Sequence, residues 1–301
     1  MPETVSGEKL YQWRQWAIQT AQSNHISSDE VDWFLQGFSD LNSLSLRVGT
    51  YRNQSDIFLK VPFVTLTRKW QQRIEDRLPV QYLTGETPWR NFSLTVCSDV
   101  LIPRPETELI IDIAKTLAAR SPLADQLKLG HWADLGTGSG AIALGLAQQF
   151  PAATLHATDI SPKALAVARQ NAQQNALADR ITFYQGSWLS PLAHLRDQLS
   201  AIVSNPPYIP SQTVVTLPPE IVGHEPHLAL DGGPDGLNSI RTLVTNSIAY
   251  LQPGGIWLIE LMDGQARAVT DLLAQQSHYS HIAIHQDLAG IQRFVSAYKA
   301  L

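Results

Sequence analysis

The chain carries Asp134-Leu135-Gly136-Thr137-Gly138-Ser139-Gly140 between a short apolar run and a helical pattern that begins at Ala141. The apolar run predicts a buried strand, and the glycines after it let the backbone turn tightly and let a ligand approach. The same run also satisfies the dinucleotide fingerprint G-x-G-x-x-[GA]. A carboxylate at Asp134 can meet a cationic amino group, which S-adenosylmethionine has and a nicotinamide dinucleotide lacks. The loop therefore favours the methyl donor, with a dinucleotide or a purely structural turn as alternatives.

Strand and helix patterns alternate from about residue 106 to the end of the chain. We predict strands at 131–135, 154–158, 181–185, 201–204 and 255–261, closing strands near 281–285 and 293–297, and helices at 107–119, 141–150, 162–175, 237–251 and 265–274. Such alternation is typical of an α/β domain with a mostly parallel sheet, in which ligands bind beyond the carboxyl ends of the strands.

The first 78 residues predict a small helical bundle. Apolar residues recur at three- and four-residue spacing in three stretches, at about 10–21, 28–38 and 66–77. The next segment alternates apolar and polar residues at Phe92–Val96, the period of a half-buried strand, and Val100–Ile102 is its expected partner. We therefore predict three parts, which are a helical domain at 1–78, a β-hairpin linker at 79–105 and an α/β domain at 106–301.

The composition is that of a soluble globular protein. The chain has 301 residues, 44% of them hydrophobic, and a net charge of −5, which disfavours duplex DNA as its main substrate. Its single cysteine, Cys97, allows no internal disulfide and no cysteine-based metal site. No signal peptide or membrane-spanning run is visible. We expect a cytoplasmic monomer that needs no metal.

Two further strand ends carry candidate ligand-binding residues. Asp159 ends the second predicted strand, where a carboxylate can accept both hydroxyls of an adenosine ribose. Its alternative role is to cap the helix that begins at Ser161-Pro162. Trp188 follows the third strand and offers a flat face on which adenine can stack, although a tryptophan here can equally belong to the core.

The fourth strand end carries Asn205-Pro206-Pro207-Tyr208. Two consecutive prolines stop the strand and hold the backbone rigid, which fixes the Asn205 amide at the carboxyl edge of the sheet. Carbonyls in such a turn are free to accept hydrogen bonds from a ligand. A rigid cluster of acceptors suits a planar NH2 group that is presented to an electrophile, and the alternative is a plain proline-rich loop. All four strand-end motifs can line one cleft.

These motifs together resemble the class I S-adenosylmethionine-dependent methyltransferases, and the proline turn resembles that of their amino-methylating members. Four further segments are similar to the release factor glutamine methyltransferase (PrmC/HemK) family, namely 79–85, 100–108, 225–233 and 287–290. The resemblance implies a seven-stranded, Rossmann-like sheet with an antiparallel last strand and a separate N-terminal helical domain. It also implies methylation of the glutamine side-chain amide in the Gly-Gly-Gln loop of peptide chain release factors.

The resemblance, with the residue analysis above, gives a set of expected site residues. The methyl donor would contact Asp134, Gly136, Thr137, Gly138, Ser139, Gly140, Asp159, Trp188 and Asn205. The substrate would contact Arg104, Glu106, Asn205, Pro206, Pro207 and Tyr208, of which Asn205, Pro206 and Tyr208 would be catalytic. Ser187 stands where the family often has an acidic residue, so Ser187 or the backbone would replace a carboxylate as the contact to the adenine amino group.

The expected mechanism is positioning, because no side chain deprotonates an amide appreciably at neutral pH. Asn205 Oδ1 and the Pro206 carbonyl would accept the two N–H bonds, and Tyr208 would stack on the amide plane. The alternatives are methylation of adenine or guanine in nucleic acid, methylation of a ribosomal-protein glutamine, and a non-enzymatic binding module. We expect a release factor as partner, and neither a membrane nor a specific nucleic-acid sequence.

Overall fold

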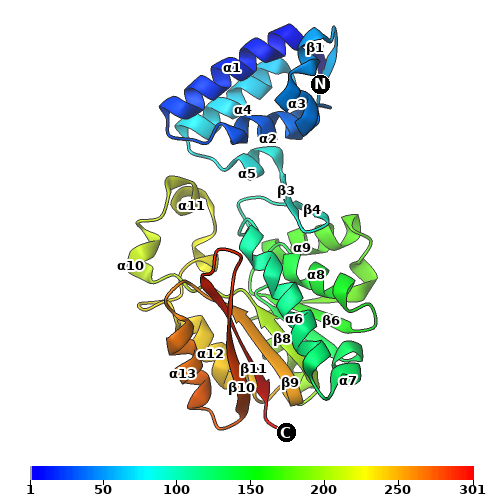
Figure 1. Cartoon of the computed structure of the whole chain (residues 1–301), viewed down its shortest axis with the longest axis vertical. Helices are drawn as coiled ribbons and strands as arrows, with labels where there is room; N and C mark the ends of the chain where they lie inside the picture. The colour runs from blue at the N-terminus through cyan, green and yellow to red at the C-terminus, as the bar shows by residue number, and fades with distance from the viewer. Residues whose placement is uncertain (1) are drawn as a thin grey trace. The chain divides into compact units, whose positions relative to one another are not determined.

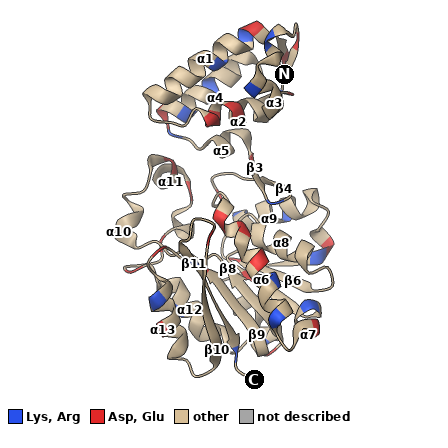
Figure 2. Cartoon of the chain, viewed as in Figure 1, with Lys and Arg blue, Asp and Glu red and all other residues tan. Residues whose placement is uncertain are grey.

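The computed structural model describes residues 2–301, which fold into two compact units (Figure 1). The first unit contains the chain up to Glu86 together with Pro218–His224, and the second contains Thr87–Leu217 and Glu225–Leu301. Residues of both signs of charge are interspersed along the helices of each unit (Figure 2). Each unit has its own hydrophobic core, so each is described separately below.

The first unit is a helical bundle built on α1 (Gly7–Ser23), α2 (Asp29–Phe38) and α4 (Phe63–Glu75). Trp13 stacks on Phe34 with ring centroids 5.9 Å apart, and both rings pack against Trp70 in the core. The predicted helices are therefore confirmed. The unit also contains α3 (Ser43–Val48), η1 (Thr50–Asn53), α5 (Val80–Thr84), α11 (Pro219–His224) and the antiparallel strands β1 (Glu3–Val5) and β2 (Ile57–Leu59).

The second unit is built on a seven-stranded sheet. In spatial order its strands are β10 (Tyr279–Gln286), β11 (Gln292–Lys299), β9 (Leu251–Glu260), β8 (Leu199–Ser204), β5 (His131–Leu135), β6 (Thr154–Asp159) and β7 (Ile181–Gln185). The five strands from β9 to β7 are parallel, whereas β11 is antiparallel to both of its neighbours. The predicted seven-stranded, mostly parallel sheet with an antiparallel last strand is confirmed.

Helices cover both faces of this sheet. One core contains residues of α6 (Leu109–Arg120), α7 (Ala124–Leu129), α8 (Ala141–Gln149) and α9 (Pro162–Gln174), and the other contains residues of η4 (Ser190–Leu195), α12 (Asn238–Ser247) and α13 (Ala266–Ala274). Successive residues of a strand point to opposite faces, so Trp132 packs in the first core and Ala133 in the second. Short helical segments complete the unit, namely η2 (Pro105–Glu108), η3 (Ala178–Arg180), α10 (Ser211–Val214) and η5 (His227–Ala229). None of the helices between Pro2 and Leu301 combines the length and apolar character that a membrane span requires.

The predicted β-hairpin is present, but its predicted partner strand is wrong. β4 (Phe92–Thr95) pairs with the preceding β3 (Glu86–Trp89), not with Val100–Ile102. The latter residues lie outside the sheets, although Val100 and Ile102 are buried. Pro103 and Pro105 follow at once and lack the N–H group that a strand ladder needs. The apolar run at Val100–Ile102 therefore reflects burial and not a strand.

Three adjacent strands bring His131, His156 and Tyr184 together inside the second unit. His156 Nε2 lies 3.0 Å from His131 Nδ1, and His156 Nδ1 lies 3.2 Å from Tyr184 Oη. Burial, together with the neighbouring His131 and His194, lowers the pKa of His156 to about 4. The imidazole is therefore held neutral in the folded protein at pH values where it is protonated in the unfolded chain.

This difference predicts an acid-sensitive stability. Between pH of about 6.5 and about 4, His156 is protonated in the unfolded chain but neutral in the folded protein. The free energy of unfolding therefore falls as pH falls through that window. When the free energy of unfolding is measured with urea at pH 7.5 and at pH 5, it should decrease less for His156→Gln than for the unmodified protein. The exposed His278→Gln serves as the matched control, and an equal loss in all three proteins would contradict the prediction.

Candidate functional site

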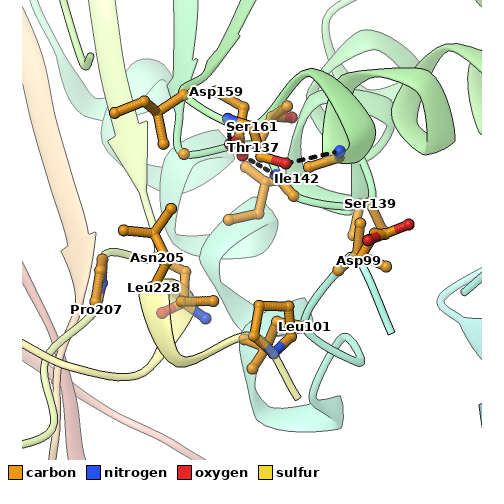
Figure 3. A pocket seen from close by; sticks show the side chains of 18 of the residues that line it. Asp99, Leu101, Thr137, Ser139, Ile142, Asp159, Ser161, Asn205, Pro207 and Leu228 are labelled. Atoms are coloured by element: carbon orange, nitrogen blue, oxygen red, sulfur yellow. Dashed lines mark hydrogen bonds between the residues drawn. The ribbon is translucent and has the colours of Figure 1, made fainter. Parts of the chain in front are cut away.

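The second unit contains a cavity of about 410 Å³ beyond the carboxyl ends of its parallel strands (Figure 3). The loops after β5, β6, β7 and β8 line it, which is where ligands bind in open α/β sheets. Segments at 98–107 and 226–231 supply further walls. Of the sequence-predicted residues, the cavity wall includes Arg104, Gly136, Thr137, Gly138, Ser139, Asp159, Trp188, Asn205 and Pro207, and it does not include Asp134, Gly140, Glu106, Pro206 or Tyr208.

The glycine loop is organised by Asp134, which lies beneath it. The Asp134 side chain is fully buried, and its Oδ2 accepts hydrogen bonds from Thr137 Oγ1 at 2.6 Å and from Ala143 N at 3.0 Å. Burial raises the pKa of Asp134 to about 7, against the effect of these two hydrogen bonds. The carboxylate therefore shapes the loop rather than lining the cavity.

Glycine is required at two positions of this loop. Gly136 has φ of 74°, in the left-handed region, and a Cβ there would lie 3.3 Å from the Trp188 ring. Gly140 caps α8 with φ of 85°, and a Cβ there would lie 3.2 Å from Ala168 Cβ. Both positions combine a backbone conformation that L side chains rarely adopt with a close neighbour. The loop is thereby held near Trp188 on one side and near α9 on the other.

Asp159 connects the loops after β5 and β6. Its Oδ2 accepts from Gly138 N at 2.9 Å, and its Oδ1 accepts from Ser161 N at 2.8 Å. The cap of α9 is the Ser161 side chain, which accepts from Ala164 N at 3.2 Å. A carboxylate oxygen has capacity for a second hydrogen bond. Asp159 can therefore hold the loops together and still face a ligand in the cavity.

Trp188 adopts a strained backbone conformation at the cavity wall. Its φ of 50° lies in the left-handed region, which is uncommon for a bulky residue. The side chain is half-buried and packs partly against the core. Strain of this kind persists only where the surrounding structure enforces it. The turn therefore keeps a flat aromatic face at a fixed place in the wall.

The proline turn is fixed from several directions. Asn205 Nδ2 donates to Thr107 Oγ1 at 3.3 Å, which leaves Oδ1 as the acceptor that this side chain can present to the cavity. Gln265 Nε2 donates to the Tyr208 carbonyl at 2.8 Å, and Tyr208 Oη donates to Glu260 Oε1 at 3.1 Å. Burial and the adjacent Glu260 raise the pKa of Tyr208 well above its ordinary value. The phenol therefore stays protonated and anchors the turn.

Arg104 makes an ion pair with a buried carboxylate at the cavity wall. Its Nη2 donates to Glu225 Oε1 at 2.7 Å, and only 2% of the Glu225 side chain is exposed. Burial raises the pKa of Glu225, whereas Arg104 acts in the opposite direction. The pair joins the wall segment at 98–107 to the residue that directly precedes the wall segment at 226–231. Glu106 is half-buried, and its charge raises the pKa of Tyr208 and Glu260.

Sequence reasoning missed about two thirds of the residues in the cavity wall. Ile160 lines the cavity, is 52% exposed and directly follows Asp159. Its position next to a predicted ligand-binding residue could have identified it from the sequence. Leu228 is 62% exposed at the wall, but nothing local to its segment indicates a cavity. Within residues 2–301, no three His, Cys, Asp or Glu side chains are grouped so that they could hold a metal ion.

The Arg104–Glu225 pair predicts an unequal effect of two arginine substitutions. Arg104→Met leaves the Glu225 charge buried without its partner, and we expect unfolding free energy to fall by about 3 kcal/mol, the lower end of the range for breaking a buried pair. Arg241→Met breaks an exposed pair with Asp235 and should cost much less, because solvent screens such a pair. Urea unfolding at pH 7.5 measures both, and equal losses would contradict the argument.

Three comparisons relate this chain to known proteins. Residues 110–224 match the family model described as "Methyltransferase small domain". A "Release factor glutamine methyltransferase" of Synechocystis sp. is 52% identical over 97% of this chain and 97% of that protein, and one of Thermosynechococcus vestitus is 46% identical over 97% and 99%. The fold is similar to that in the crystal structure of the hMettl16 catalytic domain in complex with the MAT2A 3′UTR hairpin 1, with a TM-score of 0.57. The match covers 89% of this chain and 87% of that chain at 14% sequence identity, so it shows a shared fold and no more.

Proposed function

This chain belongs to the release factor glutamine methyltransferase family, and we propose that it methylates the glutamine side-chain amide in the Gly-Gly-Gln loop of a peptide chain release factor. The methyl donor of this proposal is S-adenosylmethionine. The observation that carries it is the fixed Asn205 amide, whose Nδ2 is bound to Thr107 and whose Oδ1 is left for a substrate N–H group. The single cysteine supports the accompanying proposal that the enzyme acts in the cytoplasm.

The cavity fits such a donor in size and in the chemistry of its wall. Its volume of about 410 Å³ lies in the range of small-ligand sites. We propose that the loop at 136–140 holds the methionine end, that Asp159 accepts from the ribose hydroxyls, and that Trp188 flanks the adenine. Asp134 would act from beneath the loop, by fixing its shape. When bound, the donor supplies a methyl group that is electrophilic because it is attached to a sulfonium.

The substrate nitrogen needs positioning because an amide lone pair is delocalised into its carbonyl. In this proposal Asn205 Oδ1 and the Pro206 carbonyl accept the two N–H bonds, which draws electron density onto the nitrogen. Pro207 lies at the wall beside Asn205, and Tyr208 holds the turn in place. Preorganised acceptors of this kind act mainly by orientation and electrostatics. The nitrogen loses its proton after the transfer, when it is strongly acidic.

Asn205→Ala should slow methyl transfer, because it removes one of the two proposed acceptors. We expect the barrier to rise by about 2–4 kcal/mol, the range for losing a preorganised polar contact. Single-turnover transfer at saturating donor measures the effect, and calorimetric donor binding should change much less. Asn246→Ala, at an exposed position of α12, is the matched control. Near-normal turnover by Asn205→Ala would contradict the proposed role.

The substrate assignment is tested with labelled methyl donor and a purified release factor. We expect label on the factor and none on a factor whose loop glutamine is changed to alanine, because that change removes the proposed acceptor nitrogen. Parallel incubations contain RNA, DNA and ribosomal proteins. Label that persists on the altered factor, or that is found only on nucleic acid or a ribosomal protein, would refute the assignment.

A further inference from the structure

The proline turn is followed by a long excursion of the chain, residues 210–230, whose two ends meet. Ile209 and Asp231 form a β-bridge, and Ile209 N donates to the Leu230 carbonyl at 3.0 Å. The Asp231 carboxylate closes the same base, because it accepts from Ser211 Oγ at 2.7 Å. The excursion therefore begins and ends at the turn that is proposed to hold the substrate amide.

The returning limb of this excursion supplies the cavity wall at 226–231, and little apolar packing holds it in place. No residue of η5 is buried, and Leu228 is exposed at the wall. Segments with few buried apolar contacts are among the first to open. The limb is held at one end by the base at Asp231 and at the other by the ion pair of Glu225 with Arg104, and α11 directly precedes that pair. The order of this wall therefore depends on what fixes its ends.

The tip of the excursion, α11, belongs to the helical unit and is held there by polar contacts. No residue of α11 is buried. Glu220 Oε1 accepts from Arg73 Nη1 at 3.0 Å and lies 3.1 Å from Arg77 Nε. His224 Nε2 donates to the Asp76 carbonyl at 2.7 Å, because a carbonyl can only accept. Charge and hydrogen bonds therefore hold this helix in place of the apolar burial that holds α1, α2 and α4.

Arg73 is the buried centre of these contacts. Its side chain is 4% exposed, and it donates twice to Glu30 of α2, from Nε at 2.6 Å and from Nη2 at 2.9 Å. A buried guanidinium needs carboxylate partners to replace the water that it loses, and its planar fork gives each donor a fixed direction. Because Glu30 accepts from Nε and Nη2, the remaining Nη1 group fixes the place of Glu220.

We propose that Arg73 is a positioning residue, which holds Glu220 and thereby fixes α11 and, through α11, the cavity wall at 226–231. The inference rests on the proposed function, since S-adenosylmethionine is the ligand that probes this wall. None of the described residues of the helical unit lines the cavity. Through the excursion, that unit nevertheless determines the shape of part of the wall, and so contributes to donor binding beyond any contact that it makes with the release factor.

Glu220→Gln and Glu30→Gln form a matched pair of variants, because each neutralises one carboxylate partner of Arg73 and only Glu220 lies in the excursion. The amides at 229–231 donate within the wall, so their hydrogen exchange reports its stability. In Glu220→Gln we expect this exchange to be about fivefold faster and the calorimetric dissociation constant of S-adenosylmethionine to rise about fivefold. Both quantities should change less than about twofold in Glu30→Gln.

A role in folding alone would give the opposite order, because Glu30 accepts two hydrogen bonds from Arg73 and Glu220 accepts one. An equal response of the two variants, or an unchanged donor affinity in Glu220→Gln, would overturn the inference.

Two further outcomes are decided separately. If Glu220→Gln does not fold, Glu220→Asp replaces it, because aspartate keeps the charge but withdraws it from Arg73. Normal exchange at 229–231 in that variant would refute the role of Arg73. If the unmodified protein does not bind S-adenosylmethionine, the proposed function fails, whereas the exchange at 229–231 still decides whether Arg73 fixes the wall.

Discussion

A carboxylate that is buried at the end of a strand can only accept hydrogen bonds, so its neighbours must be donors. Asp134 imposes this requirement on the loop after β5, where the Thr137 hydroxyl and the Ala143 amide both point to it. Glu260 imposes it at the end of β9, where the Tyr208 hydroxyl is a donor. Neither carboxylate lines the cavity, yet the two loops that do are held in shape by them. The shape of the cavity therefore depends on two buried carboxylates that are not part of its wall.

The parallel order of the strands explains why much of this arrangement can be predicted. β5 and β7 have their predicted bounds, because short apolar runs bounded by turn residues are a local signal. Once β5 to β8 are known to be parallel, their carboxyl ends must meet at one edge, and the motifs that follow them must lie together. The meeting of Gly136, Asp159, Trp188 and Asn205 at one cavity follows from topology alone.

Features that depend on tertiary contacts could not be predicted in this way. α3, α5 and α10 have six residues or fewer, which is too short for a helical apolar period to appear. Val100 and Ile102 are buried by neighbours distant in sequence, so their pattern indicated a strand that does not form. The position of Asp134 was also beyond sequence reasoning, because a carboxylate beneath a loop and one facing a ligand have the same local sequence.

The carboxylates at the cavity wall argue against a catalytic base. Asp159 accepts from two backbone amides, and Asp99 Oδ1 lies 3.0 Å from Lys163 Nζ. Asp231 accepts from Ser211 and from Gly233 N, and these bonds lower its pKa. A base whose pKa is lowered binds protons less readily, and an amide N–H is a very weak acid. The acceptors that suit the proposed substrate are therefore neutral ones, and Asn205 places such an acceptor at the wall while the ionised groups hold the wall in shape.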